Sequence, residues 1–131
     1  MKEKEDLGKR KEIKVILIGE PGVGKTCIIY RYITGRFNED TINTISVSSE
    51  KKIITLNDKN NTKVELNIWD TCGQEKFRNV VNAFFIDAKA AILVYDSTSL
   101  NTFNQIKDFW YNKVKECAPE DIGNYSNIYN Y

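Results

Sequence analysis

One glycine-rich stretch constrains the fold of this chain more than any other: Gly19-Glu20-Pro21-Gly22-Val23-Gly24-Lys25-Thr26. It has the pattern G-x-x-x-x-G-K-[ST] and stands between an apolar run, 13–18, and a helix-like segment, as that pattern requires. The glycines let backbone N–H groups turn inward around an anion, and the helix adds the positive end of its dipole. An ordinary glycine-rich turn is the alternative, but the motif and both flanking elements favour a phosphate-binding loop.

Two side chains of this loop have expected roles. Lys25 would reach the β- and γ-phosphates of a nucleotide. The Thr26 hydroxyl would ligate Mg²⁺. The loop by itself therefore predicts a site for the phosphates of a nucleoside triphosphate.

Composition limits the classes of protein to which the chain can belong. Its 131 residues make one domain, and its 19 basic and 18 acidic residues nearly cancel, so we expect no nucleic-acid partner held by bulk charge. No apolar run approaches a membrane span and the start lacks a signal-peptide core, so we expect a cytoplasmic protein. The absence of histidine excludes Ser-His and Cys-His nucleophilic catalysis. The three cysteines lack metal-ligand spacing and are expected to be reduced thiols.

The hydrophobic pattern predicts alternating strands and helices in one domain, residues 13–118. The charged segment 1–12 is expected to be a disordered tail, and 119–131 an irregular one. We expect strands at 13–18, 48–56, 62–69 and 90–95, and helices at 26–34, 80–86 and from about Ser99 to Cys117. The second and third strands form a hairpin, so the predicted fold class is α/β, with a mostly parallel sheet, one antiparallel strand and helices on both faces.

A second motif, Trp69-Asp70-Thr71-Cys72-Gly73-Gln74-Glu75, stands at the end of the third strand, with Asp70 placed 45 residues after Lys25. An acidic residue that ends a neighbouring strand is where a protein with this phosphate loop holds Mg²⁺ from the second side. Taken alone, the Trp-Asp pair is equally consistent with a core aromatic followed by a turn-forming aspartate. The phosphate loop at a suitable distance favours the metal role.

Together the two motifs resemble those of the small GTPases of the Ras superfamily, whose second signature reads Trp-Asp-Thr-Ala-Gly-Gln-Glu. Thr44 lies eighteen positions after Thr26, where the family keeps the switch I threonine. Phe37 lies eleven positions after Thr26, where an aromatic ring stacks on guanine. Within the superfamily the chain is most similar to the Rab proteins, over about residues 13–118. The segments that are similar to Rab sequences are 25–27, 67–71, 74–78, the pair Phe84-Phe85 and 93–98.

The resemblance implies the P-loop NTPase (small G-protein) fold, GTP or GDP and Mg²⁺ as cofactors, and GTPase activity in vesicle traffic. Exchange factors, GTPase-activating proteins and effectors would bind through 36–49 and 70–86. The implied catalytic residues are Lys25, Gly73, whose N–H would contact the γ-phosphate, and Gln74, which would orient the attacking water. The implied nucleotide-binding residues are Gly22, Val23, Gly24, Lys25, Thr26, Cys27, Phe37, Thr44 and Gly73, and the implied Mg²⁺ residues are Thr26, Thr44 and Asp70.

The chain also departs from the Rab pattern. Ser49 replaces an aromatic residue that, with Trp69 and Phe84, would form an apolar patch facing effectors. Cys72 replaces the usual alanine, and Pro21, which has no backbone N–H, stands where Ras proteins have a glycine beside the γ-phosphate. Neither guanine-reading motif, Asn-Lys-x-Asp or Ser-Ala-Lys, occurs, and the prenylated C-terminal cysteines are missing. We therefore expect a fold without the last strands and helices, and no membrane anchor in this chain.

Three functions remain open on the sequence. The first is a Rab-like switch with slow intrinsic GTP hydrolysis. The second is a truncated, non-cycling module that keeps the switch surfaces but binds nucleotide weakly. The third, a P-loop kinase or another ATPase, is disfavoured by the segment 69–75 and by the lack of a lid. Because the phosphate and Mg²⁺ residues occur without the base-reading motifs, we expect weak guanine-nucleotide binding with only a slight preference over ATP.

Overall fold

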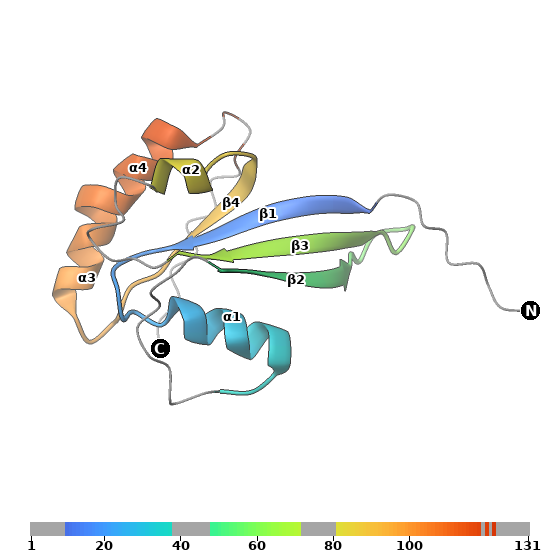
Figure 1. Ribbon diagram of the computed structural model, residues 1–131, viewed down its shortest axis with the longest axis horizontal. Coiled ribbons are helices and arrows are strands. Elements are labelled where there is room, and N and C mark those ends of the chain that lie inside the picture. The colour runs from blue at the N-terminus through green and yellow to red at the C-terminus, as the bar shows by residue number, and fades with distance from the viewer. Residues whose placement is uncertain (1–9, 38–47, 72–80, 119, 121, 123–131) are drawn as a thin grey trace, which may run out of the picture.

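The part of the chain that the structure describes forms a four-stranded sheet with helices on both faces (Figure 1). The computed structural model describes residues 10–37, 48–71, 81–118, 120 and 122. The strands are β1 (Lys11–Ile18), β2 (Ser48–Thr55), β3 (Lys63–Asp70) and β4 (Ala88–Leu93), in the spatial order β2-β3-β1-β4. β1 pairs in parallel with both β3 and β4, and β2 pairs antiparallel with β3. The predicted α/β class, with a mostly parallel sheet and one antiparallel strand, is confirmed.

Helix α1 (Lys25–Thr34) covers one face of the sheet. It ends at Gly35, which adopts a left-handed conformation with φ 72° and donates its backbone N–H to Arg31 O at 2.8 Å. Glycine is the residue that tolerates this conformation at the end of a helix. The predicted helix and its glycine stop are therefore confirmed, with a start one residue earlier than expected.

The other face is covered by α2 (Val81–Phe84) and by a long helix in three parts, α3 (Leu100–Gln105), η2 (Ile106–Trp110) and α4 (Tyr111–Cys117). The three parts follow one another without a break, as the predicted single helix from about Ser99 requires. The middle part, η2, is a π-helix, which the apolar spacing did not predict. The helical pattern expected over 80–86 ends at Phe84, and Asp87 adopts a left-handed conformation with φ 59° before β4 begins.

Alternate residues of β1 contribute to two apolar layers, one on each face. Ile16 and Ile18 pack with the layer under α2, η2 and α4, and Leu17 packs with the layer under α1. The first layer also contains Phe84, Phe85, Ala88, Ala91, Leu93, Ile106, Trp110 and Val114, and the second contains Val23, Ile29, Ile68 and Val94. A strand that is covered on both faces reads as a continuous apolar run, which is why 13–18 was recognisable.

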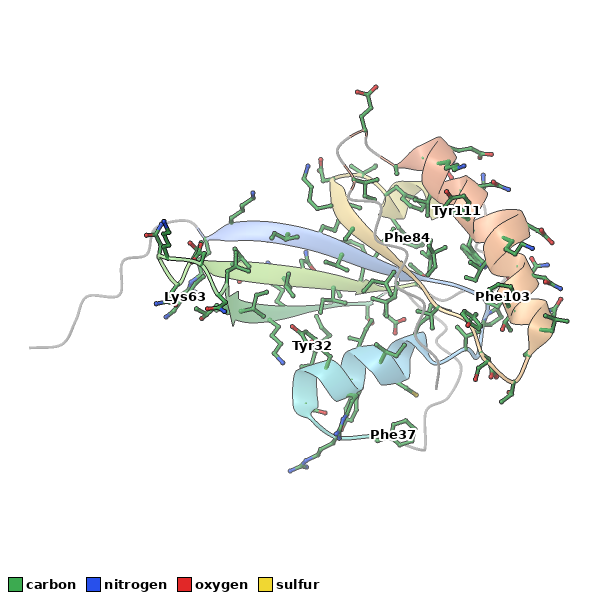
Figure 2. All side chains as sticks on the ribbon, turned by 180° about the vertical axis from the view of Figure 1, so that it is seen from behind. Tyr32, Phe37, Lys63, Phe84, Phe103 and Tyr111 are labelled. Atoms are coloured by element: carbon green, nitrogen blue, oxygen red, sulfur yellow. The ribbon has the colours of Figure 1, made fainter. Side chains whose placement is uncertain are left out.

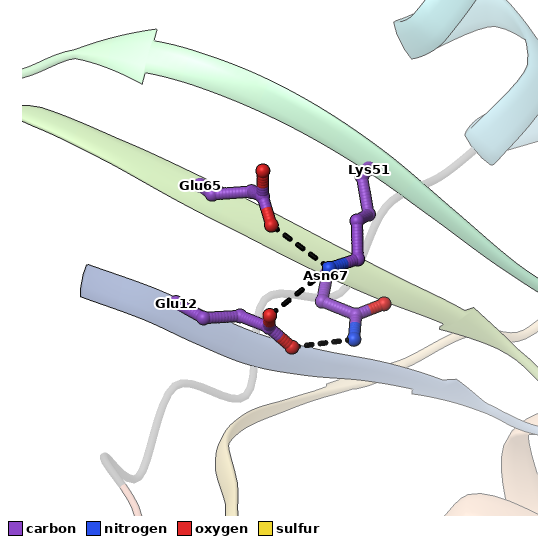
Figure 3. A network of polar contacts seen from close by, with 4 residues as sticks. All are labelled: Glu12, Lys51, Glu65 and Asn67. Carbon is purple, nitrogen blue, oxygen red and sulfur yellow. Dashed lines mark hydrogen bonds and ion pairs between the residues drawn. The ribbon is translucent and has the colours of Figure 1, made fainter. Parts of the chain in front are cut away.

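The strand β1 begins at Lys11, two residues before the predicted start, so the expected tail 1–12 is too long. The reason is a polar network across three strands (Figure 3). The Glu12 carboxylate accepts hydrogen bonds from Asn67 Nδ2 at 2.7 Å and from Lys51 Nζ at 3.0 Å, and Lys51 Nζ also donates to Glu65 at 2.9 Å. Charged side chains that pair across strands stabilise a sheet that apolar periodicity alone would end sooner.

Candidate phosphate-binding site

The loop between β1 and α1 depends on glycine at three positions. Gly22 and Gly24 have φ of 77° and 100°, in the left-handed region that other residues rarely adopt. Gly19 lies against the chain that leaves β4, because a Cβ placed there would be 2.2 Å from the backbone oxygen of Val94. The glycines of the motif are therefore required by this backbone, whether or not a ligand is bound.

Lys25, the first residue of α1, points into the loop. Its side chain is charged yet the residue is only 5% exposed. Its Nζ donates hydrogen bonds to Gly19 O at 3.1 Å and to Glu20 O at 2.8 Å. A buried ammonium beside the N-terminal end of a helix concentrates positive charge where an anion can approach the backbone.

Thr26 and Asp70 meet at the second side of the loop. Asp70 ends β3 and lies in register with Leu17 of β1, and its Oδ2 accepts the Thr26 hydroxyl at 2.6 Å. The residue is 4% exposed, and burial raises the pKa of its carboxyl group, against the opposing effects of the Thr26 hydrogen bond and the Lys25 charge. Its other oxygen, Oδ1, is buried and has no hydrogen-bond partner in the described part of the chain.

This pair of oxygen ligands fits Mg²⁺. The cation prefers carboxylate and hydroxyl oxygens and is usually bound by one or two such side chains together with phosphate oxygens. A buried carboxylate with one oxygen lacking a partner is costly unless a ligand compensates it. Among the described residues, no group of three or more His, Cys, Asp and Glu side chains could hold a metal by itself.

A cavity of about 380 Å³ adjoins the loop on the α1 side, with mainly apolar walls. It is lined by Val23, Gly24, Cys27, Arg31 and Phe37. Phe37 is 60% exposed, and Figure 2 shows it on the side of α1 that faces away from the sheet. The structure thus brings four of the predicted nucleotide-binding residues to one cavity, and it adds Arg31, which the motifs did not indicate.

Some predicted site residues cannot be placed. Thr44, Gly73 and Gln74 lie outside the described residues. The chain that leads to Gly73 and Gln74 is held against β1, because the Thr71 hydroxyl donates to Leu17 O at 2.7 Å and Thr71 is 1% exposed. Their roles therefore remain predictions.

The site also contains a contact that the motifs did not indicate. The indole Nε1 of Trp110, in η2, donates to Glu20 Oε1 at 3.0 Å. Trp110 is 1% exposed, and a buried indole N–H needs an acceptor. The pattern could not show that this acceptor is a residue of the phosphate loop 90 positions earlier.

Around Trp69 and Phe84 the surface is more polar than in the Rab pattern, as expected from Ser49 standing in place of an aromatic residue. Ser49 is exposed and lies in register with Trp69, whose ring is 6.5 Å from that of Phe84. Lys14 Nζ lies 4.3 Å from the centre of the Trp69 ring and donates to Ile86 O at 2.8 Å. The aromatic pair is therefore bordered by a hydroxyl and an ammonium.

In the described part of the chain, no helix is both long enough and apolar enough to cross a membrane.

Comparison with known proteins adds independent findings. Residues 14–126 match the family model described as the Ras family. The chain is 40% identical over 121 residues to the Ras-related protein SEC4 of Saccharomyces cerevisiae, 41% identical over 110 residues to the Ras-related protein Rab-26 of Rattus norvegicus, and 40% identical over 109 residues to the Ras-related protein Rab-8B of Homo sapiens. The matches cover 88%, 83% and 83% of this chain but 54%, 41% and 51% of those proteins. The chain thus spans about half the length of these relatives.

Proposed function

Because the chain belongs to the Ras family and resembles Rab-type members of it, we propose that it is a Rab-like molecular switch that binds GTP and GDP and acts in vesicle traffic. One observation supports this proposal most strongly. The hydroxyl of Thr26 and the buried carboxylate of Asp70 meet beside the buried ammonium of Lys25. Motifs 45 residues apart in the sequence therefore form one site that suits a phosphate and its cation.

The proposed ground state is built by this chain's own groups. The backbone of 22–26 and the Lys25 ammonium bind the phosphates, while Thr26, Asp70 and Thr44 offer oxygen atoms to the cation. The cavity that would accept the nucleoside is bordered by Val23, Gly24, Cys27 and Phe37. A bound Mg²⁺ would supply neutralisation of charge on the phosphate oxygens.

Hydrolysis is proposed to be slow without a partner. Gln74 orients the attacking water, the Gly73 N–H contacts the γ-phosphate, and Lys25 stabilises negative charge on it. The sequence assigns no arginine to the reacting phosphate. An activating protein that supplies one is worth about 10³ to 10⁵ in rate. The segments 36–49 and 70–86 are the proposed surfaces for exchange factors, activators and effectors, since ordering of such segments by the γ-phosphate is how these switches signal.

A non-cycling module remains the second candidate. It is favoured by a single observation, the absence of the two guanine-reading motifs from residues 1–131. Such a module would keep the partner surfaces and bind nucleotide weakly. The affinity for nucleotide, rather than the hydrolysis rate, separates the two candidates.

The proposed role of Gln74 in orienting the attacking water can be tested by substitution. Gln74→Leu should lower the single-turnover rate of GTP hydrolysis by about tenfold or more while leaving the dissociation constant for GTP within about twofold, since only the attacking water loses a contact. Rapid-quench measurements with GTP bound to excess protein would give both values, and the substitution Gln105→Leu, on the helix α3, provides the control. An unchanged hydrolysis rate would remove Gln74 from the proposed mechanism.

A further inference from the structure

Glu20, the second residue of the phosphate loop, is held through both its backbone and its side chain. Its backbone oxygen accepts the Lys25 ammonium at 2.8 Å, and its carboxylate accepts the Trp110 indole N–H at 3.0 Å. Trp110 is 1% exposed and belongs to the apolar layer under α2, η2 and α4. The side chain of Glu20 is therefore directed to the face of the sheet opposite the one that α1 covers.

The direction of this carboxylate matters because the loop is built for an anion. A negative charge one residue into the loop repels phosphate if it turns toward the phosphate side, and the repulsion is strong where the surroundings are poorly solvated. An indole N–H is a donor only, so it attracts the carboxylate without presenting an acceptor of its own. The contact thus fixes a charge that would otherwise oppose binding.

The donor lies in an unusual part of the helix. In η2 the backbone N–H of Tyr111 donates to Ile106 O, five residues earlier, instead of four as in an α-helix. The wider turn changes the direction of the side chains that follow it, and π-helical segments within α-helices are frequent at functional sites. Ile106 and Trp110, at the two ends of η2, are both buried, so the segment is anchored where it presents the indole to the loop.

We propose that Trp110 is a positioning residue for the phosphate loop: its indole N–H holds the Glu20 carboxylate away from the phosphates and so keeps the loop in the conformation that binds them. The expected effect of Trp110 on nucleotide affinity rests on the proposed function. Its expected effect on the conformation of the loop does not depend on that function.

Two measurements on the full chain test this inference. The first is amide hydrogen exchange of residues 19–26 in the protein without added nucleotide. The second is the dissociation constant for GDP with Mg²⁺. Both are made on wild type, Trp110→Phe, Glu20→Ala, the double variant and Glu20→Gln, which keeps an acceptor oxygen. Tyr111→Phe, one residue further on the same helix and 43% exposed, is the matched control.

We expect Trp110→Phe to speed exchange in the loop and to raise the dissociation constant, each by about tenfold to a hundredfold, as for the loss of one hydrogen bond to a charged group. In the Glu20→Ala background the same substitution should change neither value. Glu20→Gln, which keeps an acceptor oxygen, should speed loop exchange less than Glu20→Ala does, and Tyr111→Phe should behave as wild type. Equal effects of Trp110→Phe with Glu20 and with Ala at position 20 would show that Trp110 acts by packing alone, and would overturn the inference.

Other outcomes are also decisive. If Trp110→Phe does not fold, the pair Glu20→Ala and Glu20→Gln replaces it, and identical loop exchange in these two variants would overturn the inference. If the wild type does not bind GDP, the proposed function fails, while the exchange measurement still decides whether Trp110 positions the loop.

Discussion

At the scale of single residues, the site is assembled from groups that do not favour folding by themselves. Lys25 and Asp70 are 5% and 4% exposed although both can be charged. Gly19, Gly22 and Gly24 give the chain no side chain to pack. Burial of charge costs free energy unless a partner compensates it. The two buried charged residues are therefore explained by a ligand rather than by stability, whereas the glycines are required by the backbone of the loop itself.

Asp70 is the clearest case of a buried charged residue that lowers stability when no ligand is bound. Burial raises the pKa of its carboxyl group in the folded state, so the ionised form is more favourable in the unfolded chain. Ionisation of the Asp70 carboxyl group therefore costs stability, and this cost grows as the pH rises from its ordinary pKa of 3.8 through the raised pKa. In chelator at neutral pH, Asp70→Asn should raise the melting temperature by about 2–4 °C, and it should weaken GDP binding in Mg²⁺ by about tenfold or more.

The matched control is Asp58→Asn. Asp58 is exposed, and hydrogen bonds from Thr62 lower the pKa of its carboxyl group, so this substitution should lower the melting temperature instead. Calorimetry in chelator and titrations with and without Mg²⁺ provide the values. A fall in stability in both variants would contradict the sign worked out for Asp70.

Gly19 tests the geometry of the loop. A Cβ there would meet the backbone oxygen of Val94, which cannot move freely because the Val94 N–H donates to Ile18 O at 2.8 Å. Gly19→Ala should therefore cost about 2–3 kcal/mol of unfolding free energy in urea titrations. Gly35→Ala, where φ is 72° but no atom is within 4 Å, should cost only about 1 kcal/mol. Equal losses in the two variants would mean that the close approach at Gly19 has been misjudged.

At the scale of elements, the spacing of apolar residues predicted the helices and strands that depend mainly on that spacing. Helix α1 ends where the glycine at position 35 predicted, because a left-handed residue stops a helix whatever surrounds it. The start of β1 was missed because Lys11 and Glu12 are charged, and their place in the strand depends on Asn67 and Lys51, which are distant in sequence. The π-helical turn η2 was missed because apolar residues four apart fit an α-helix equally well.

The polar network across β1, β2 and β3 should make stability depend on pH. Hydrogen bonds, first from Asn67 and then from Lys51, lower the pKa of Glu12 below its ordinary value of 4.5. A lowered folded-state pKa stabilises the protein above the unfolded value, and this contribution is lost as the pH falls through the lowered pKa. The wild type should thus melt higher than Glu12→Gln at about pH 7, and the difference should shrink as the pH falls below 4.5.

Thermal denaturation of both proteins from about pH 7 to about pH 3 would measure this difference. Glu50→Gln, which removes another exposed carboxylate from the hairpin of β2 and β3, controls for the loss of one negative charge. A difference between wild type and Glu12→Gln that stays constant over this range would show that the hydrogen bonds in Figure 3 do not hold the carboxylate in its ionised form.

At the scale of the whole molecule, the parallel sheet explains why the site lies where it does. The phosphate loop follows β1, Asp70 ends β3, and Val94 follows β4, so all three stand at the carboxyl ends of parallel strands. Ligands of open α/β sheets bind at these ends. Sequence motifs predicted Lys25, Thr26 and Asp70 because their chemistry fixes residue type and order. They could not predict the contact between Glu20 and Trp110, because neither residue type nor spacing requires it.

In the proposed function, the loop 19–26 binds the phosphates of a nucleotide. The most direct measurement is a titration of fluorescent GDP in Mg²⁺, with unlabelled ATP as competitor, on wild type and Lys25→Ala. Lys59→Ala removes an exposed lysine from the turn between β2 and β3 and is the matched control. We expect saturable micromolar binding by wild type and by Lys59→Ala, with ATP competing nearly as well as GDP.

Lys25→Ala should lower the affinity by about tenfold to a hundredfold, as expected for the loss of charge-assisted contacts with phosphate. Nanomolar binding that ATP does not displace would refute the expectation of weak base recognition, but not the phosphate loop. Equal affinities of Lys25→Ala and Lys59→Ala for GDP would show that the loop 19–26 does not bind the phosphates.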